Sequence, residues 1–106
     1  SGDNIFMIKK NKVCMPPIVA GALPGITRDT VAEIALKSGL SVEEKFFSRM
    51  EMFVADEVFL TGTGAEIVPV IKIDGRVIGD GKPGRLTKDL VKNFRAKVAS
   101  EGTPIE

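Results

Sequence analysis

Histidine, tryptophan and tyrosine are absent from this 106-residue sequence, and cysteine occurs once. Histidine is the commonest general base and metal ligand, and tryptophan and tyrosine are two of the three aromatic side chains on which nucleic acid bases stack. Any catalysis must therefore depend on other groups. Because Cys14 has no partner for an internal disulfide and no paired cysteine spacing occurs, we expect no metal site. We interpret Cys14 as a small core residue without a catalytic role.

The sequence also lacks an excess of charge and a long apolar run. Its 15 lysines and arginines against 14 acidic residues give a formal net charge of +1, which creates no long-range field for nucleic acid or an anionic membrane. No apolar run approaches the roughly 20 residues that span a bilayer, and no signal-peptide pattern occurs. We therefore expect a cytoplasmic protein with no nucleic acid or membrane partner, folded as a single domain over residues 1–106.

What is present is a series of short β-prone segments interrupted by two amphipathic stretches. Apolar residues recur at helical spacing over residues 27–38, and again from Leu86 to Val98. We expect a short helical turn at the Ser-x-x-Glu capping box that begins at Ser48. The strands expected are 4–8, 13–15, 40–47, 57–61, 67–73 and 76–78, with hairpin turns at 9–12 and 74–75. This pattern predicts an α/β fold, with two principal helices on a mixed, strongly twisted sheet or partial barrel.

The loop that opens the first predicted helix, Leu23-Pro24-Gly25-Ile26-Thr27, has the composition of an anion-binding turn. The N–H groups of a first helical turn have no intrahelical acceptor, and the helix dipole adds partial positive charge there, so the turn suits a phosphate. The hydroxyl of Thr27 is an additional donor. The alternative is that Thr27 is an ordinary N-cap and Gly25 an ordinary turn residue, which the pattern alone favours.

A second loop with similar chemistry is Thr61-Gly62-Thr63-Gly64-Ala65-Glu66, where a predicted strand ends. Glycines let an anion approach the backbone closely, and the two threonine hydroxyls can donate to a phosphate or a carboxylate. The alternative is a tight bend between two strands. A ligand that carries both a phosphate and a carboxylate could use both loops, and we predict that they converge in space.

Five segments, taken in order, resemble the branched-chain amino acid aminotransferases, which are fold-type IV pyridoxal-phosphate enzymes. The segments are Gly2-Asp3-Asn4-Ile5-Phe6, Leu23 to Asp29, Ala55 to Phe59, Gly62 to Ile67 and Ile78-Gly79-Asp80-Gly81. The resemblance runs along nearly the whole chain, but it covers only the C-terminal part of the family's large domain. It implies a barrel-like α/β domain, which agrees with the fold predicted from the pattern.

The resemblance implies roles for both loops. It places Leu23 against the ring of the cofactor, pyridoxal 5'-phosphate, and the donors of the two loops on its phosphate and on the substrate carboxylate. The cofactor-binding residues implied are Leu23, Gly25, Ile26, Thr27 and Thr63. The substrate-binding residues implied are Thr63, Gly64 and Ala65. Gly64 stands where alanine is usual in the family, a departure that would loosen the carboxylate site, and Arg85 stands where proline is frequent, with little expected effect.

The resemblance further implies a parent enzyme of branched-chain amino acid metabolism that transfers an amino group between leucine, isoleucine or valine and 2-oxoglutarate. The family's Schiff-base lysine, the acidic partner of the cofactor ring and the side-chain pocket all lie upstream of the position that matches Ser1. We therefore expect this chain to contain no catalytic residue and to be inactive alone. Its expected partners are the missing N-terminal part of the same enzyme, amino acid and 2-oxo acid substrates, and further copies in a homo-oligomer.

Three alternatives remain open at this stage. Another fold-type IV enzyme, a D-amino acid aminotransferase or an aminodeoxychorismate lyase, would share the same loops, although residues 62–66 look more like the branched-chain group. A stand-alone module could bind a small phosphorylated ligand without catalysis. A structural fragment could self-associate through an exposed core surface.

Overall fold

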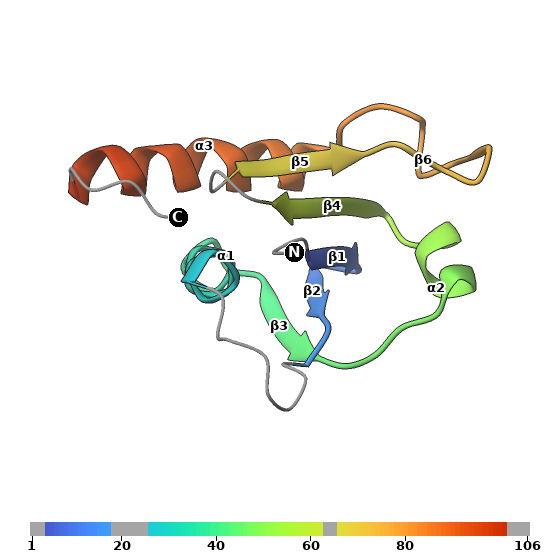
Figure 1. Cartoon of the computed structure of the whole chain (residues 1–106), viewed down its shortest axis with the longest axis horizontal. Helices are drawn as coiled ribbons and strands as arrows, with labels where there is room; N and C mark the ends of the chain where they lie inside the picture. Colours follow the sequence, from blue (N-terminus) through green and yellow to red (C-terminus); the bar gives the residue numbers. More distant parts are fainter. Residues whose placement is uncertain (1–3, 18–25, 63–65, 102–106) are drawn as a thin grey trace.

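A computed structural model describes residues 4–17, 26–62 and 66–101 of the chain. In these residues a five-strand sheet has the order β3-β2-β1-β4-β5, and β6 and β7 form a separate two-strand ribbon (Figure 1). The strands are β1 (Asn4–Lys9), β2 (Lys12–Met15), β3 (Ser41–Glu44), β4 (Glu57–Gly62), β5 (Glu66–Val70), β6 (Lys72–Ile73) and β7 (Arg76–Val77). The helices are α1 (Ile26–Lys37), α2 (Arg49–Phe53) and α3 (Arg85–Glu101).

The predicted α/β class and the mixed, twisted sheet are confirmed. The β2 and β3 strands pair in parallel, and the other neighbours in the sheet pair antiparallel. Figure 1 shows the twist, because β4 and β5 run across the view while β3 runs steeply down it. The described strands β3 and β5 stand at the two edges of the five-strand sheet.

Both predicted hairpin turns are present, and each is a two-residue turn. Lys10 and Asn11 have φ of 50° and 64° between β1 and β2, and Asp74 and Gly75 have φ of 50° and 80° between β6 and β7. Two successive residues with positive φ are typical of type I′ turns, whose twist matches that of the strands. Glycine and asparagine or aspartate adopt this backbone more readily than most residues.

Two predicted strands are wrong in extent, and in each case the neighbouring strand explains why. The strand predicted over 40–47 is only Ser41–Glu44, because its partner β2 ends at Met15 and prolines follow, which cannot donate to a ladder. The strand predicted over 67–73 breaks after Val70. This residue pairs with Val58 near the start of β4, and the chain beyond it turns back as the β6-β7 ribbon.

The helices begin and end close to the predicted residues. The α1 helix spans Ile26–Lys37 and is followed by Gly39 with φ of 88°, a common way for a helix to end. The capping box of α2 is present: the Glu51 N–H donates to Ser48 Oγ at 3.2 Å, and the Ser48 N–H donates to Glu51 Oε1 at 3.0 Å. The α3 helix continues to Glu101, and residues 102–106 lie outside the described residues.

The core has one part on each face of the sheet. The part beneath α1 and α3 is centred on Phe6 and Phe59, whose rings stack with centroids 4.9 Å apart. On the opposite face, Met7 and Val58 pack with residues of α2 and of the ribbon. Cys14 lies in this second part, and burial raises the pKa of its thiol, in line with a core residue that has no catalytic role.

Candidate functional site

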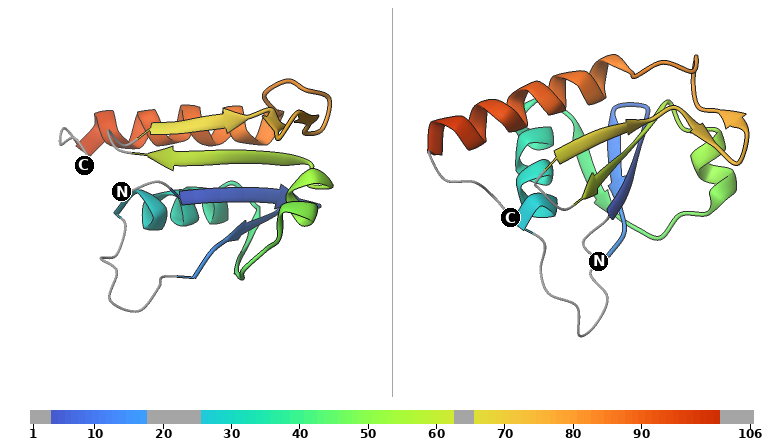
Figure 2. Two further views of the ribbon diagram at one scale, coloured as in Figure 1. Left: turned by 45° about the vertical axis from the view of Figure 1, so that its right-hand side comes forward. Right: turned by 45° about the horizontal axis from the view of Figure 1, so that its top comes forward.

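The ends of three elements lie together on one side of the molecule. Both views of Figure 2 place the N-terminal end of α1, the end of β4 at Gly62 and the start of β5 at Glu66 on this side. The two predicted loops lead into or out of these ends. Of the predicted site residues, Ile26 and Thr27 are described and form the start of α1, where Thr27 is half-buried.

The other predicted site residues lie outside the described residues. They are Leu23, Gly25, Thr63, Gly64 and Ala65. The convergence of the two loops therefore stays a prediction. What the structure describes is the frame around them: the residues that hold the start of α1 and the last residues of β4.

Arg28 in the first turn of α1 is the most buried cation near this end of the fold, with a side chain only 6% exposed. Its Nη2 donates to the backbone carbonyl of Pro16 at 2.9 Å and to Oε2 of Glu44 at 2.5 Å. Its Nη1 lies 3.6 Å from a carboxylate oxygen of Asp29. One guanidinium therefore links the start of α1 to the residue after β2 and to the last residue of β3. Sequence reasoning missed this contact, because nothing in the pattern around Arg28 distinguishes a buried arginine from a surface one.

Thr61, the fifth residue of β4, carries a buried hydroxyl at the same end of the sheet. The residue is 1% exposed, and its Oγ1 has no hydrogen-bond partner in the described structure. Side chains alternate along a strand, so Thr61 projects from the same face as Phe59, toward the side that α1 and α3 cover. An unsatisfied buried hydroxyl costs about 1–3 kcal/mol relative to a paired one. Such a group suits a site that a water or a ligand completes.

The start of α3 is closed by a carboxylate. Glu57 at the start of β4 accepts hydrogen bonds from the N–H groups of Leu86 at 3.1 Å and Thr87 at 2.7 Å. Gly84 makes room for this carboxylate, because a Cβ at that position would overlap the side chain of Glu57. The first-turn amides of α3 are thus already paired. Glu57 was predicted only as a strand residue, and no sequence signal linked it to a helix 29 residues away.

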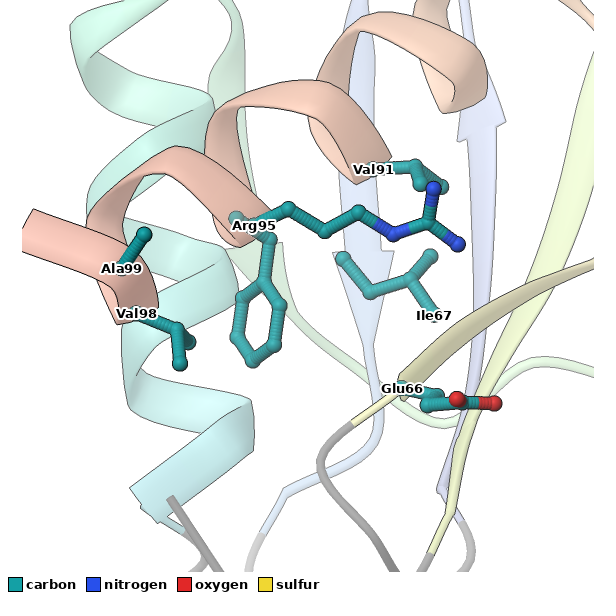
Figure 3. A pocket seen from close by; sticks show the side chains of 7 residues that line it. Glu66, Ile67, Val91, Arg95, Val98 and Ala99 are labelled. Atoms are coloured by element: carbon teal, nitrogen blue, oxygen red, sulfur yellow. The ribbon is translucent and has the colours of Figure 1, made fainter. Parts of the chain in front are cut away.

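A cavity of about 260 Å³ lies between β5 and α3 (Figure 3). Its walls are mostly apolar, and the charged side chains of Glu66 and Arg95 stand at its edge. The lining residues are Glu66, Ile67, Val91, Phe94, Arg95, Val98 and Ala99. Of the predicted site residues that the structure describes, neither Ile26 nor Thr27 lines this cavity.

The titratable groups with shifted pKa values belong to other parts of the fold. Hydrogen bonds from Lys37 and Lys97 hold the pKa of the Glu33 carboxyl below its usual value, and this exposed cluster joins the middle of α1 to α3.

No group of three or more histidine, cysteine or acidic side chains could hold a metal ion within residues 4–17, 26–62 and 66–101. In the same part of the chain, no helix combines the length and apolar character needed to cross a bilayer.

Comparison with known proteins identifies the family. The sequence model described as amino-transferase class IV matches residues 1–73. Over 94 residues the chain is 43% identical to the branched-chain-amino-acid aminotransferase of Escherichia coli strain K12, which covers 89% of this chain and 30% of the relative. The chain therefore spans about a third of the length of this curated relative.

Solved structures of branched-chain amino acid aminotransferases also resemble this chain in fold. A branched-chain amino acid aminotransferase from Thermobaculum terrenum in its PLP form superposes with a TM-score of 0.83 at 42% identity, covering 93% of this chain and 33% of that one. The enzyme from Thermoproteus uzoniensis, solved with norvaline, superposes with a TM-score of 0.83 at 41% identity, covering 94% and 33%. The chain belongs to the class IV aminotransferase family, close to the branched-chain amino acid aminotransferases, and corresponds to about a third of their length.

Proposed function

We propose that the protein to which this chain belongs transfers an amino group between leucine, isoleucine or valine and 2-oxoglutarate, with pyridoxal 5'-phosphate as cofactor. The observation that carries the proposal is the similarity to branched-chain amino acid aminotransferases over nine-tenths of this chain, in sequence and in fold together. Relatives solved in the PLP form and with norvaline support the choice of cofactor and of an amino acid substrate.

The described residues fit the phosphate of this cofactor. The first turn of α1 begins at Ile26, and Thr27 beside it is half-buried. At the end of β4, the buried hydroxyl of Thr61, two residues before Thr63, has no hydrogen-bond partner among the described residues. First-turn N–H groups and hydroxyls are the donors that an anion needs at a helix N-terminus. We assign the phosphate to the N–H groups of Ile26 and Thr27 and to the hydroxyls of Thr27 and Thr63.

In this proposal the residues of this chain bind and orient the cofactor and the amino acid substrate. Here we propose that Leu23 lies against the cofactor ring, Gly25 belongs to the loop that holds the phosphate, and the turn Thr63-Gly64-Ala65 receives the carboxylate of the amino acid, which fixes the orientation of its amino group. When bound, pyridoxal phosphate supplies the aldehyde that accepts the amino group and the ring that takes up an electron pair. The lysine that binds the cofactor covalently is assigned to a part of the enzyme outside this chain.

An amino-transfer assay on the full-length gene product that contains this chain tests the proposal. Leucine, isoleucine and valine are offered separately with 2-oxoglutarate and pyridoxal phosphate, and glutamate formation is measured. All three donors should react, and D-alanine should not. Reaction with D-alanine alone would assign the protein to the D-amino acid aminotransferases, and pyruvate release from aminodeoxychorismate would assign it to the lyases. Phosphate binding without any turnover would leave the alternative of a non-catalytic module.

The isolated 106-residue chain provides a second check. Because the covalent chemistry is assigned elsewhere, this chain should show no amino transfer with any of the three donors. None of its ten lysines falls within the five short segments that carry the family resemblance. Turnover by the isolated chain would mean that one of these lysines acts as the covalent residue and would overturn the assignment.

A further inference from the structure

The geometry points to Arg28 as a positioning residue: its buried guanidinium clamps the first turn of α1 to Pro16 and to the end of β3, and so holds the N–H groups of Ile26 and Thr27 ready for the phosphate. This inference rests on the proposed function, because it concerns the same turn. It adds a residue, Arg28, and a partner, Glu44, that have no place in the set of direct cofactor contacts given above.

The clamp joins both ends of one chain segment. The carbonyl of Pro16 precedes the loop, and Arg28 follows it 12 residues later, where its Nη2 donates to that carbonyl at 2.9 Å. The same guanidinium reaches Glu44, the last residue of β3. A binding turn that is already held in place loses less entropy when its ligand binds, so the clamp raises the affinity of the turn for its ligand.

The charges around Arg28 distinguish a positioning role from direct binding of the phosphate. Arg28 lies between the carboxylates of Glu44 and Asp29, and its side chain is 6% exposed, whereas that of Glu44 is 53% exposed. Its positive charge is therefore already balanced by described neighbours. A buried cation paired in this way fixes geometry, and the loss of its partner leaves a desolvated charge without compensation.

The two roles predict opposite effects for removal of Glu44. If the guanidinium attracted the phosphate through its charge, Glu44→Ala would remove a competing negative charge and tighten cofactor binding. If Arg28 is a clamp, Glu44→Ala releases one anchor and weakens binding. The adjacent variant Glu43→Ala is a matched control, because it changes the net charge equally on the same strand but removes a surface pair with Lys12.

The experiment measures the dissociation constant of pyridoxal phosphate for the full-length gene product and its variants. We expect Glu44→Ala to raise the dissociation constant about tenfold, as for the loss of one hydrogen bond to a charged group. Glu43→Ala should stay within about twofold, as is usual for an exposed pair. At saturating cofactor, kcat should be retained in both variants. Tighter or unchanged binding by Glu44→Ala would overturn the inference.

Arg28→Met tests the other partner of the clamp, with Arg85→Met as its control. Arg85 stands in the first turn of α3 with a side chain 79% exposed and pairs only with Asp89 among the described residues. Without cofactor, Arg28→Met should increase hydrogen exchange about tenfold at the second-turn amides of α1, which bond to the first-turn carbonyls, and leave α3 unchanged. Equal loss of protection in both helices would show a merely structural role. If Arg28→Met fails to fold, Arg28→Lys provides the same comparison, because an ammonium lacks the planar fork that serves both acceptors.

The outcomes separate failure of this inference from failure of the proposed function. If the wild-type protein does not bind pyridoxal phosphate, the proposed function fails, and the exchange measurement still decides whether Arg28 orders the turn. If the wild-type protein binds it and transfers amino groups while the Glu44 variant binds equally well, only the clamp is wrong.

Discussion

The two long helices of this fold begin in different ways. At the start of α3, Glu57 reaches across from β4 and accepts hydrogen bonds from two first-turn N–H groups. At the start of α1, Arg28 instead anchors the turn from within it, through hydrogen bonds to Pro16 and Glu44. The first arrangement fixes the start of α3 to β4. The second fixes the start of α1 to the ends of β2 and β3, and under the proposed function the first-turn N–H groups of α1 bind the phosphate.

The threonines of the two helix starts differ in the same sense. Thr87 in α3 is 1% exposed, and its hydroxyl has no partner among the described residues, whereas Thr27 in α1 is half-buried. We therefore interpret Thr87 as a packing residue, and under the proposed function Thr27 is the binding residue.

The largest effect is expected from Glu57→Ala, which removes the carboxylate that closes α3. Loss of two hydrogen bonds between a carboxylate and helix N–H groups should lower the free energy of unfolding by about 2 kcal/mol. Urea denaturation of the full-length gene product measures it. Since the start of α1 is held separately, cofactor affinity should change little. A large loss of affinity would show that the two helix starts are coupled.

Gly84→Ala should disturb the same contact between Glu57 and the start of α3. The new Cβ overlaps the end of the Glu57 side chain, which must swing out of its hydrogen bonds, so we expect a loss of about 1–2 kcal/mol. In Glu57→Ala the obstacle is gone, and the second substitution should cost almost nothing. A double-mutant cycle measures this coupling. Additive effects would contradict the proposed displacement of Glu57.

Substitution of the two threonines by valine compares the helix starts directly. Thr27→Val should weaken pyridoxal phosphate binding by about 1 kcal/mol, because a hydroxyl donor to the phosphate is lost. Thr87→Val should leave binding unchanged and keep or raise stability, since it replaces an unsatisfied buried hydroxyl. Equilibrium binding and thermal unfolding of both variants give the comparison. Equal loss of affinity in the two would remove the distinction between the helix starts.

The smallest effect concerns α2, whose start is capped by its own residues. Hydrogen bonds from the Ser48 backbone and from Lys45 hold the pKa of the Glu51 carboxyl below its usual value. The folded-state pKa is depressed, so this stabilisation is complete above the unfolded-state pKa and is lost as the pH falls through the lower, folded-state value. An NMR titration of the Glu51 amide and carboxyl should show the cap opening at a pH below the usual titration range of a glutamate. An ordinary or raised pKa for Glu51 would contradict the cap.

The local elements were predictable because their signals are local. The turn at Asp74-Gly75 and the capping box at Ser48 each depend on residues within four positions of one another, and both are present. Strand lengths were less predictable, because a strand ends where its neighbour ends. The ladder of β3 stops at Glu44, opposite Met15, for a reason that lies in another part of the sequence.

The candidate site also combines features with a local sequence signal and features that depend on distant residues. Composition and helix periodicity indicated the start of α1, and the family resemblance supplied roles for Ile26 and Thr27. The contacts that support this turn were not predictable, since Arg28 meets Pro16 and Glu44 across separations of 12 and 16 residues. The closure of α3 by Glu57 spans about 30 residues and carries no local pattern. Long-range polar contacts of single side chains leave no periodic signal in a sequence.

The most direct test of this account is a crystal structure of the full-length gene product with pyridoxal 5'-phosphate. The account predicts that the phosphate accepts hydrogen bonds from the N–H groups of Ile26 and Thr27 and from the hydroxyl of Thr63. Glu57 should still pair with Leu86 and Thr87, and Arg28 with Pro16 and Glu44. A phosphate bound at the start of α3 with Glu57 displaced, or bound away from both helix starts, would contradict it.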